Sequence, residues 1–356
     1  MMLRRMIGIF AVIACGVAAA EPQALAPASG RTNVFAGREA ILVTVIRGDA
    51  VAGRLVWTLT ALGRTLASGT LDVRHDGGPA TTAEVAAAIP AIKEGVVVEA
   101  VFTAVLVDAA GSRLATHARP VRIFPADPFV DRTRWLEALA LALVDPVGDT
   151  ERVLTAAGVP FTLVRSEADI ATAAPRVLLV GEGASWLDRP DLPGLVTRLA
   201  AQGTPVLCLA PRDGTLPLSG AADTPVEAVA KRLVFERTGI VTALDPRLDG
   251  GDWGAAGGSI VSRLAIVAEG DHAVIRIAAA ADEPAGWPWL EIDYADPASP
   301  TSGSTLVVCG YGIVAHWDET PAARYLFAAV LGRLAADGPG DQPQSTPNDS
   351  LPENPR

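Results

Sequence analysis

The chain is poor in cysteine, lysine and aromatic residues, and these shortages exclude several classes of protein. Three cysteines in 356 residues, with no Cys-x-x-Cys pair, cannot form a disulfide framework. Lysine occurs only at Lys93 and Lys231, and the formal net charge is −11, so the average surface repels phosphate backbones and anionic lipid. We therefore predict no nucleic-acid partner. The sequence also gives no sign of a cofactor or of a metal site.

The apolar run near the start of the chain is too short to span a bilayer and has the form of a secretion signal. Two arginines precede Met6–Val17, and three alanines end at Ala20. We predict that residues 1–20 are a signal peptide and that the protein is exported to the periplasm, the cell envelope or the medium. An alternative stays open. The sequence Val-Ile-Ala-Cys resembles a bacterial lipobox, in which lipid on Cys15 would be the protein's only attachment to a membrane.

The first half of the remaining chain has the pattern of an all-β domain. Short apolar alternations, interrupted by Gly, Pro and Asp, run from Asn33 to Phe124. Their number and spacing predict an immunoglobulin-like β-sandwich over residues 31–125. Trp57 alternates with leucines, so we favour a core position for it over sugar stacking. The predicted strands are Ala40–Arg47, Arg54–Ala61, Thr65–Arg74, Thr81–Ile89, Gly95–Asp108 and Arg113–Ile123.

Strands and helices alternate beyond a stiff Phe-Pro-Ala-Asp-Pro connector at residues 124–128. This alternation predicts an α/β domain over residues 130–336, followed by a disordered tail over residues 337–356. The fold class is therefore multi-domain, all-β followed by three-layer α/β. The predicted strands are Leu139–Val144, Phe161–Val164, Arg176–Val180, Pro205–Leu209, His272–Ala279, Trp289–Tyr294 and Thr305–Gly310. The predicted helices are Asp149–Ala157, Glu167–Ala173, Leu192–Ala201 and Pro321–Leu334, with a helix or strand between Val226 and Arg237.

Residues from about 134 to 334 resemble the class I glutamine amidotransferase-like fold, a flavodoxin-like α/β sheet. The turn Gly181-Glu182-Gly183 is similar to the double-glycine turn of that family, and Gln202–Leu209 resembles the approach to its Gly-x-Cys-x-Gly elbow. The resemblance places the family's nucleophile at Ala210, whereas Cys208 lies two residues earlier between two leucines. It therefore implies the fold without the catalytic cysteine.

Local chemistry agrees with this position of the cysteine. An elbow nucleophile needs a strained turn with small neighbours, and no glycine flanks Cys208. Pro211 favours an extended backbone at Ala210. We expect Cys208 and Cys309 to be buried free thiols, and a disulfide between them stays as the alternative.

The family's base is a His-x-Glu after a late strand, and this chain offers His316, Trp317 and Asp318. A His-Asp pair without a nucleophile cannot run acyl transfer. We favour the competing interpretation, in which Asp318 or Thr320 caps the following helix.

Two further clusters combine carboxylates with tryptophan. One lies in a Gly-rich loop at Asp245, Asp249, Asp252 and Trp253, and we favour a solvated loop over a calcium or sugar site there. In the other, Trp287 and Trp289 precede Glu291 and Asp293. Stacking rings beside carboxylates suit a carbohydrate site, yet packing of Trp289, Leu290 and Ile292 in a strand is the interpretation we favour.

Amidotransferase-like domains without activity occur as trimerisation domains of β-galactosidases and in exported proteins of carbohydrate-active systems, and this chain resembles them. The resemblance implies a non-catalytic binding or assembly protein that acts through a carbohydrate ligand, a protein partner or a homo-oligomer. The alternative is a glycoside or ester hydrolase that uses carboxylates in the loops of the α/β domain. We predict no catalytic or metal-binding residue. The ligand-binding candidates are Gly181, Glu182, Gly183, Asp245, Asp252, Trp253, Trp287, His316 and Asp318.

Overall fold

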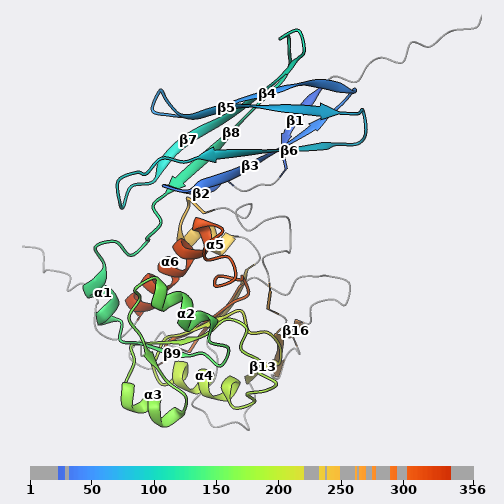
Figure 1. Ribbon diagram of the computed structural model, residues 1–356. Helices are drawn as coiled ribbons and strands as arrows, with labels where there is room; N and C mark the ends of the chain where they lie inside the picture. The colour runs from blue at the N-terminus through green and yellow to red at the C-terminus, as the bar shows by residue number, and fades with distance from the viewer. Residues whose placement is uncertain are drawn as a thin grey trace, which may run out of the picture.

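The computed structural model shows a β region stacked on an α/β region (Figure 1). It describes residues 23–28, 32–219, 232–236, 239–248, 261–262, 264–269, 275–277, 289–294 and 303–337. The predicted signal peptide, the lipidation candidate Cys15 and the tail after Asp337 lie outside these ranges. Among the helices of the described ranges, none has the length and apolar character needed to cross a bilayer.

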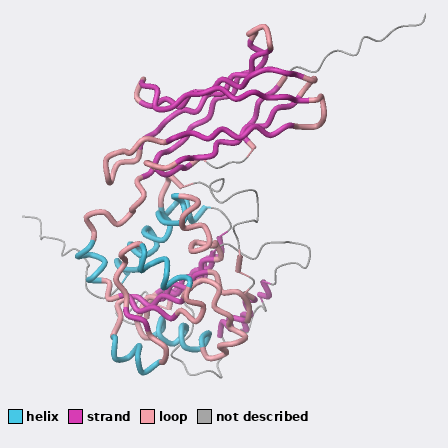
Figure 2. The backbone as a smooth tube through the Cα atoms, in the orientation of Figure 1, coloured by secondary structure: helices cyan, strands magenta, loops and turns pink. Residues whose placement is uncertain are grey.

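The β region consists of two facing sheets with one core between them (Figure 2). Alternate side chains of each strand point inward, as in β4, where Leu55, Trp57 and Leu59 are buried. They meet Leu42 and Ile46 of the opposite sheet, and the core position predicted for Trp57 is confirmed. The smaller sheet has the order β1 (Ala24–Pro27), β3 (Glu39–Arg47) and β6 (Thr81–Ala88). The larger sheet has the order β2 (Asn33–Phe35), β8 (Arg113–Phe124), β7 (Val98–Asp108), β4 (Val51–Ala61) and β5 (Arg64–His75).

The α/β region is built around a seven-stranded mixed sheet. In sheet order the strands are β10 (Thr162–Leu163), β9 (Leu141–Val144), β11 (Val177–Val180), β12 (Val206–Leu209), β18 (Thr305–Cys309), β17 (Trp289–Asp293) and β14 (Arg232–Glu236). Five neighbouring strands run parallel to one another. The sixth strand is antiparallel to the fifth, and the seventh is antiparallel to the sixth. Four of the parallel strands, β9, β11, β12 and β18, are buried along their whole length and almost entirely apolar, as expected for strands covered on both faces.

Helices cover both faces of this sheet and form two separate cores. One face packs against α1 (Thr133–Ala138), α2 (Asp149–Ala156), α5 (Gly239–Leu244) and α6 (Pro321–Asp337). The other face packs against α3 (Glu167–Ala173) and α4 (Leu192–Ala201). Because the five strands are parallel, their carboxyl ends lie at one edge of the sheet, and the loops that follow these strands emerge there.

Several elements differ from the sequence-based prediction. The strand expected from residue 139 begins at Leu141, because α1 occupies the residues immediately before it. Of the two alternatives predicted between Val226 and Arg237, the structure has the strand, β14; within the segment predicted as a strand from His272, the described residues form β16 (Ile275–Ile277). Strand β16 is the edge of a small sheet in which it pairs with β15 (Ala265–Glu269), and β15 pairs in turn with β13 (Thr215–Ser219); the sequence pattern indicated neither β13 nor β15.

Candidate functional site

The candidate site lies at the carboxyl edge of the parallel strands, where the loops after β11, β12 and β18 meet. Gly181 follows β11 directly, and a Cβ atom there would lie 2.6 Å from Asp145 Oδ1 and 2.9 Å from Thr150 Oγ1. Only glycine therefore permits this close approach. The backbone N–H of Glu182 donates to Thr150 Oγ1 at 2.9 Å. This bond holds the turn that follows β11 against the start of α2.

Glu182 binds the loop that follows β18. Its carboxylate is 9% exposed and accepts the backbone N–H groups of Val314 at 2.6 Å and Ala315 at 3.0 Å. Burial raises the pKa of Glu182, although these two N–H groups and His316 act in the opposite direction. The side chain thus connects two loops that lie 132 residues apart in the sequence.

Ala210 lies at the end of β12 in a left-handed conformation, with φ of 29°. The predicted extended backbone is wrong, because hydrogen bonds to the end of β18 and to the loop after β11 outweigh the preference that Pro211 imposes. The N–H of Ala210 donates to Cys309 O at 2.6 Å, and its carbonyl accepts the N–H of Gly183 at 3.1 Å. A non-glycine residue held at positive φ after a parallel strand is the backbone geometry of a nucleophile elbow. The side chain at this elbow is a methyl group.

The two described cysteines are free and fully buried, as predicted. They lie on opposite faces of the sheet, because Cys208 belongs to the core against α3 and α4 while Cys309 belongs to the core against α6. A disulfide between them is therefore excluded. Burial raises the pKa of Cys208 far above that of a free thiol and that of Cys309 to about 12, so neither is a nucleophile at neutral pH.

His316 is the polar side chain that the loop after β18 brings to the site. It is 23% exposed, and its Nδ1 lies 2.8 Å from Glu319 Oε2. The predicted partner, Asp318, instead pairs with Arg324 and Arg38, while a turn closed by the Glu319 N–H to His316 O bond brings Glu319 beside the imidazole. Glu319 was missed by sequence reasoning, although a search at a spacing of three residues would have found it. Thr320 caps the next helix through a 3.3 Å bond from the N–H of Ala322, as one interpretation predicted.

Asp318 lies between the β region and the α/β region instead of at the sheet edge. It pairs with Arg324 and lies 3.7 Å from Arg38 of the β region. Arg324 is itself buried, donates to the carbonyl of Ala126 at 2.8 Å and stacks 4.7 Å from the centre of the Phe35 ring. Asp318 therefore takes part in the contact between the two regions, with a side chain that is 75% exposed.

Asp245 belongs to the same contact between the regions. Although burial opposes it, hydrogen bonds from Arg247 hold the pKa of Asp245 below its usual value. The guanidinium of Arg247 stacks on Phe124 and Tyr325, and its carbonyl accepts a 2.8 Å hydrogen bond from Arg122. Of the ligand-binding candidates, the structure thus gathers Gly181, Glu182, Gly183 and His316, and separates Asp245 and Asp318 from them.

Among the described residues, the two tryptophan clusters do not form an aromatic surface on which a sugar could stack. Trp289 is fully buried in β17 and Glu291 pairs with Arg333, so Trp289 packs a strand, as we favoured. The candidates Asp252, Trp253 and Trp287 lie outside the described residues. Within the described ranges, no three His, Cys, Asp or Glu side chains gather closely enough to hold a metal ion.

Exposed apolar side chains accompany the polar ones at this edge and were not predicted. Val147, 50% exposed, lies 3.8 Å from the position of a Cβ atom on Gly183. Val261 is exposed as well, and its N–H donates to Gly310 O at 3.0 Å. The site therefore offers one imidazole, one buried carboxylate and an apolar rim. That combination can bind a ligand, but it supplies no side-chain nucleophile at the elbow.

Comparison with known proteins gives no family for this chain. No family model matches it, and no curated protein matches its sequence. Solved structures with partial likeness include a β-glucuronidase of glycoside hydrolase family 2, with a TM-score of 0.22 and 11% identity over 28% of this chain and 11% of that one. A cycloisomaltooligosaccharide glucanotransferase from Paenibacillus sp. has a TM-score of 0.23 and 12% identity over 44% of this chain and 20% of that one.

A Niemann-Pick type C2 protein from the Japanese carpenter ant has a TM-score of 0.22 and 8% identity, over 30% of this chain and 96% of that one. The chain therefore spans about one ninth of the length of the β-glucuronidase and one fifth of that of the glucanotransferase. TM-scores of this size carry no argument about the function of the chain.

Proposed function

We propose that this protein is an exported, non-catalytic binding or assembly protein of a carbohydrate-related envelope system. In this proposal an immunoglobulin-like sandwich precedes a flavodoxin-like, amidotransferase-like domain whose elbow has lost its nucleophile. The observation that carries the proposal is Ala210, which holds positive φ at the end of β12 without a reactive side chain.

The sheet order supports the fold in this proposal. Numbered along the chain, the five parallel strands have the order 2-1-3-4-5, which is the order of flavodoxin-like folds. The turn Gly181-Glu182-Gly183 lies beside the elbow, as the resemblance implies, because the N–H of Gly183 donates to the carbonyl of Ala210. In this proposal the elbow has the strained backbone but lacks the reactive side chain that such a backbone carries in enzymes.

The alternative, a hydrolase that uses paired carboxylates, has less support. Glycoside hydrolysis needs two carboxyl groups that face one substrate. Asp245 is paired with Arg247, and Asp318 is paired with Arg324 and Arg38. Glu182 is buried and both of its oxygens accept backbone N–H groups.

Two measurements on the mature protein test the proposal. A panel of glutamine, aryl esters and aryl glycosides should show no turnover above the background rate. Size-exclusion chromatography with light scattering should show an oligomer, or a complex when a binding partner is added. Turnover that disappears in a His316→Ala variant would overturn the non-catalytic part of the proposal and favour the hydrolase.

A further inference from the structure

A cavity of about 480 Å³ lies between α3 and α4, away from the elbow, and has no part in the function proposed above. Its inner wall is apolar and is formed by the buried side chains of Val144, Ile170 and Leu195. Val144 is the last residue of β9, so the cavity opens at the carboxyl end of the sheet. Ligands of open α/β sheets bind at this end, outside the strands and near the point where the strand order reverses. Here that point is between β9 and β11.

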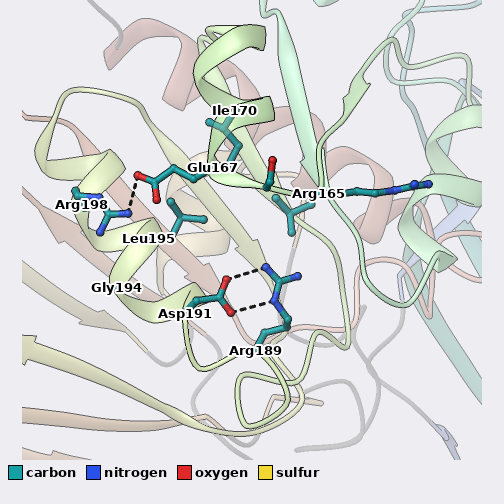
Figure 3. A pocket seen from close by; sticks show the side chains of 10 residues that line it. Arg165, Glu167, Ile170, Arg189, Asp191, Gly194, Leu195 and Arg198 are labelled. Carbon is teal, nitrogen blue, oxygen red and sulfur yellow. Dashed lines mark hydrogen bonds and ion pairs between the residues drawn. The ribbon is translucent and has the colours of Figure 1, made fainter.

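Two arginines line the mouth of the cavity, and each is held by a carboxylate (Figure 3). Arg189 Nε and Nη2 donate to the two oxygens of Asp191 at 3.0 Å and 2.8 Å. Arg198 Nη2 donates to Glu167 Oε1 at 2.8 Å. The pairs fix the guanidinium groups without using up their donors, because a guanidinium has five N–H groups and these bonds take two from Arg189 and one from Arg198.

Both arginines at the mouth keep N–H donors that their ion pairs do not use. In the described ranges, the remaining N–H groups of Arg189 and Arg198 meet no protein acceptor, and their side chains are 32% and 43% exposed. Arg189 and Arg198 balance the charges of the two acids of the lining, Asp191 and Glu167, and Arg165 adds one positive charge farther from the ion pairs. A neutral apolar molecule would leave the unused guanidinium donors without partners.

We propose that this cavity binds a small organic anion, a molecule that carries a carboxylate or phosphate group on a ring of about the size of a sugar. The anionic group accepts hydrogen bonds from the unused donors of Arg198 at the mouth, since a guanidinium group binds such anions with two donors at once. The ring lies against Val144, Ile170 and Leu195. The volume exceeds that of a single inorganic ion and lies within the range of small-molecule sites.

Two glycines provide a matched pair of variants. Gly194 lies on α4 and lines the cavity, and a Cβ atom there would meet no other atom within 4 Å. Gly332 lies on α6, away from the cavity, and is equally open. Leucine at either position should favour its helix, because glycine is a poor helix former. Gly194→Leu should therefore fill the cavity without unfolding the protein, and Gly332→Leu is the control.

Arg165 provides a second control. It belongs to the lining, but its side chain points away from the two ion pairs (Figure 3). Arg198→Gln and Arg165→Gln remove the same charge from the same part of the surface, yet only Arg198 is in a position to contact the ligand. A general effect of surface charge would weaken binding equally in both variants.

The test is isothermal titration calorimetry of the full chain with galacturonate, galactose 6-phosphate, galactose and inorganic phosphate. We expect at least one of the two ring anions to bind about tenfold more tightly than galactose and inorganic phosphate. Arg198→Gln and Gly194→Leu should each weaken that binding about tenfold or more, while Arg165→Gln and Gly332→Leu leave it within about twofold. The two anions distinguish a carboxylate ligand from a phosphate ligand.

Three results would overturn the proposal: no binding of either ring anion, equal binding of galactose, or equal loss in Arg165→Gln and Arg198→Gln. None of these results bears on the elbow. A failure here is therefore distinguishable from a failure of the proposed function, which depends on the loops around Ala210 and His316.

Discussion

Ala210 retains a backbone conformation that alanine adopts at a cost of about 1 kcal/mol. Ala210→Gly should relieve this strain and offset the loss of one buried methyl group, so we expect the free energy of unfolding to change by less than about 0.5 kcal/mol. Ala184→Gly is the control, since Ala184 is also buried but has an ordinary φ. The control should lose about 1 kcal/mol or more in urea denaturation. Equal losses in both variants would show that Ala210 carries no strain.

Glu182 should make stability depend on pH, because its pKa is raised in the folded protein. An acid whose pKa is raised on folding contributes its stability fully below its unfolded pKa, about 4.3 for glutamate, and loses it as pH rises through the folded pKa. Relative to Glu182→Gln, the wild type should therefore lose stability as pH rises from about 4. The charged neighbours that act on Glu182 are His316 and Asp149.

Urea denaturation of wild type and Glu182→Gln at a series of pH values checks this expectation. Parallel profiles would show that the carboxyl group titrates alike in the folded and unfolded chains. A wild type that gains stability over the variant with rising pH would reverse the predicted sign.

The packing of strands β4 and β5 depends on one glycine. Gly69 of β5 lies opposite Trp57 of β4, and a Cβ atom on Gly69 would approach the indole ring to 2.7 Å. We expect Gly69→Ala to lower the free energy of unfolding by about 1–3 kcal/mol, because the ring must move within a packed core. A shifted tryptophan emission spectrum should accompany the loss. Gly78→Ala, where the added atom meets nothing within 4 Å, should change stability by less than about 0.5 kcal/mol.

Elements with strong apolar patterns could be predicted from the sequence, and weakly patterned ones could not. Helix α4 has the predicted bounds, because a proline near its start and a glycine after its end punctuate an amphipathic run. Strand β2, by contrast, is three residues long, and its place is determined by pairing with β8. Such tertiary contacts leave no periodic signal in the sequence.

The candidate site, too, could be predicted from the sequence only in part. The sheet edge with Gly181, Glu182 and Gly183 could be predicted, because loops after neighbouring parallel strands meet in space. The left-handed backbone of Ala210 could not, since local proline chemistry favoured the extended form, and hydrogen bonds with Cys309 and Gly183, both far away in the sequence, decided the outcome. The same holds for Asp318, whose partner Arg38 is 280 residues away.

The β region and the α/β region should unfold as one unit. Phe124 ends the last strand of the β region but belongs to the core of the α/β region, and Arg324 of α6 stacks on Phe35. Arg324→Leu should lower the free energy of unfolding by about 2 kcal/mol and separate one thermal transition into two. Arg152→Leu, which breaks an exposed ion pair, should cost less than about 0.5 kcal/mol and leave one transition.

Differential scanning calorimetry measures both effects. Two transitions in the wild type itself would contradict the claim that the regions are energetically coupled. An unchanged single transition in Arg324→Leu would show that the stacked arginine contributes little to that coupling.

At the scale of the whole molecule, Glu182, His316 and two exposed valines lie at the carboxyl edge of the sheet, where Ala210 holds a positive φ. Under the proposed function this edge binds a carbohydrate without turning it over, and that is the central claim. A glycan array probed with the mature wild type and with His316→Ala tests it most directly. The account predicts that the wild type retains at least one glycan, unmodified, and that the variant retains it about tenfold less well. A wild type that binds no glycan, or that binds it as well as His316→Ala does, would contradict the account.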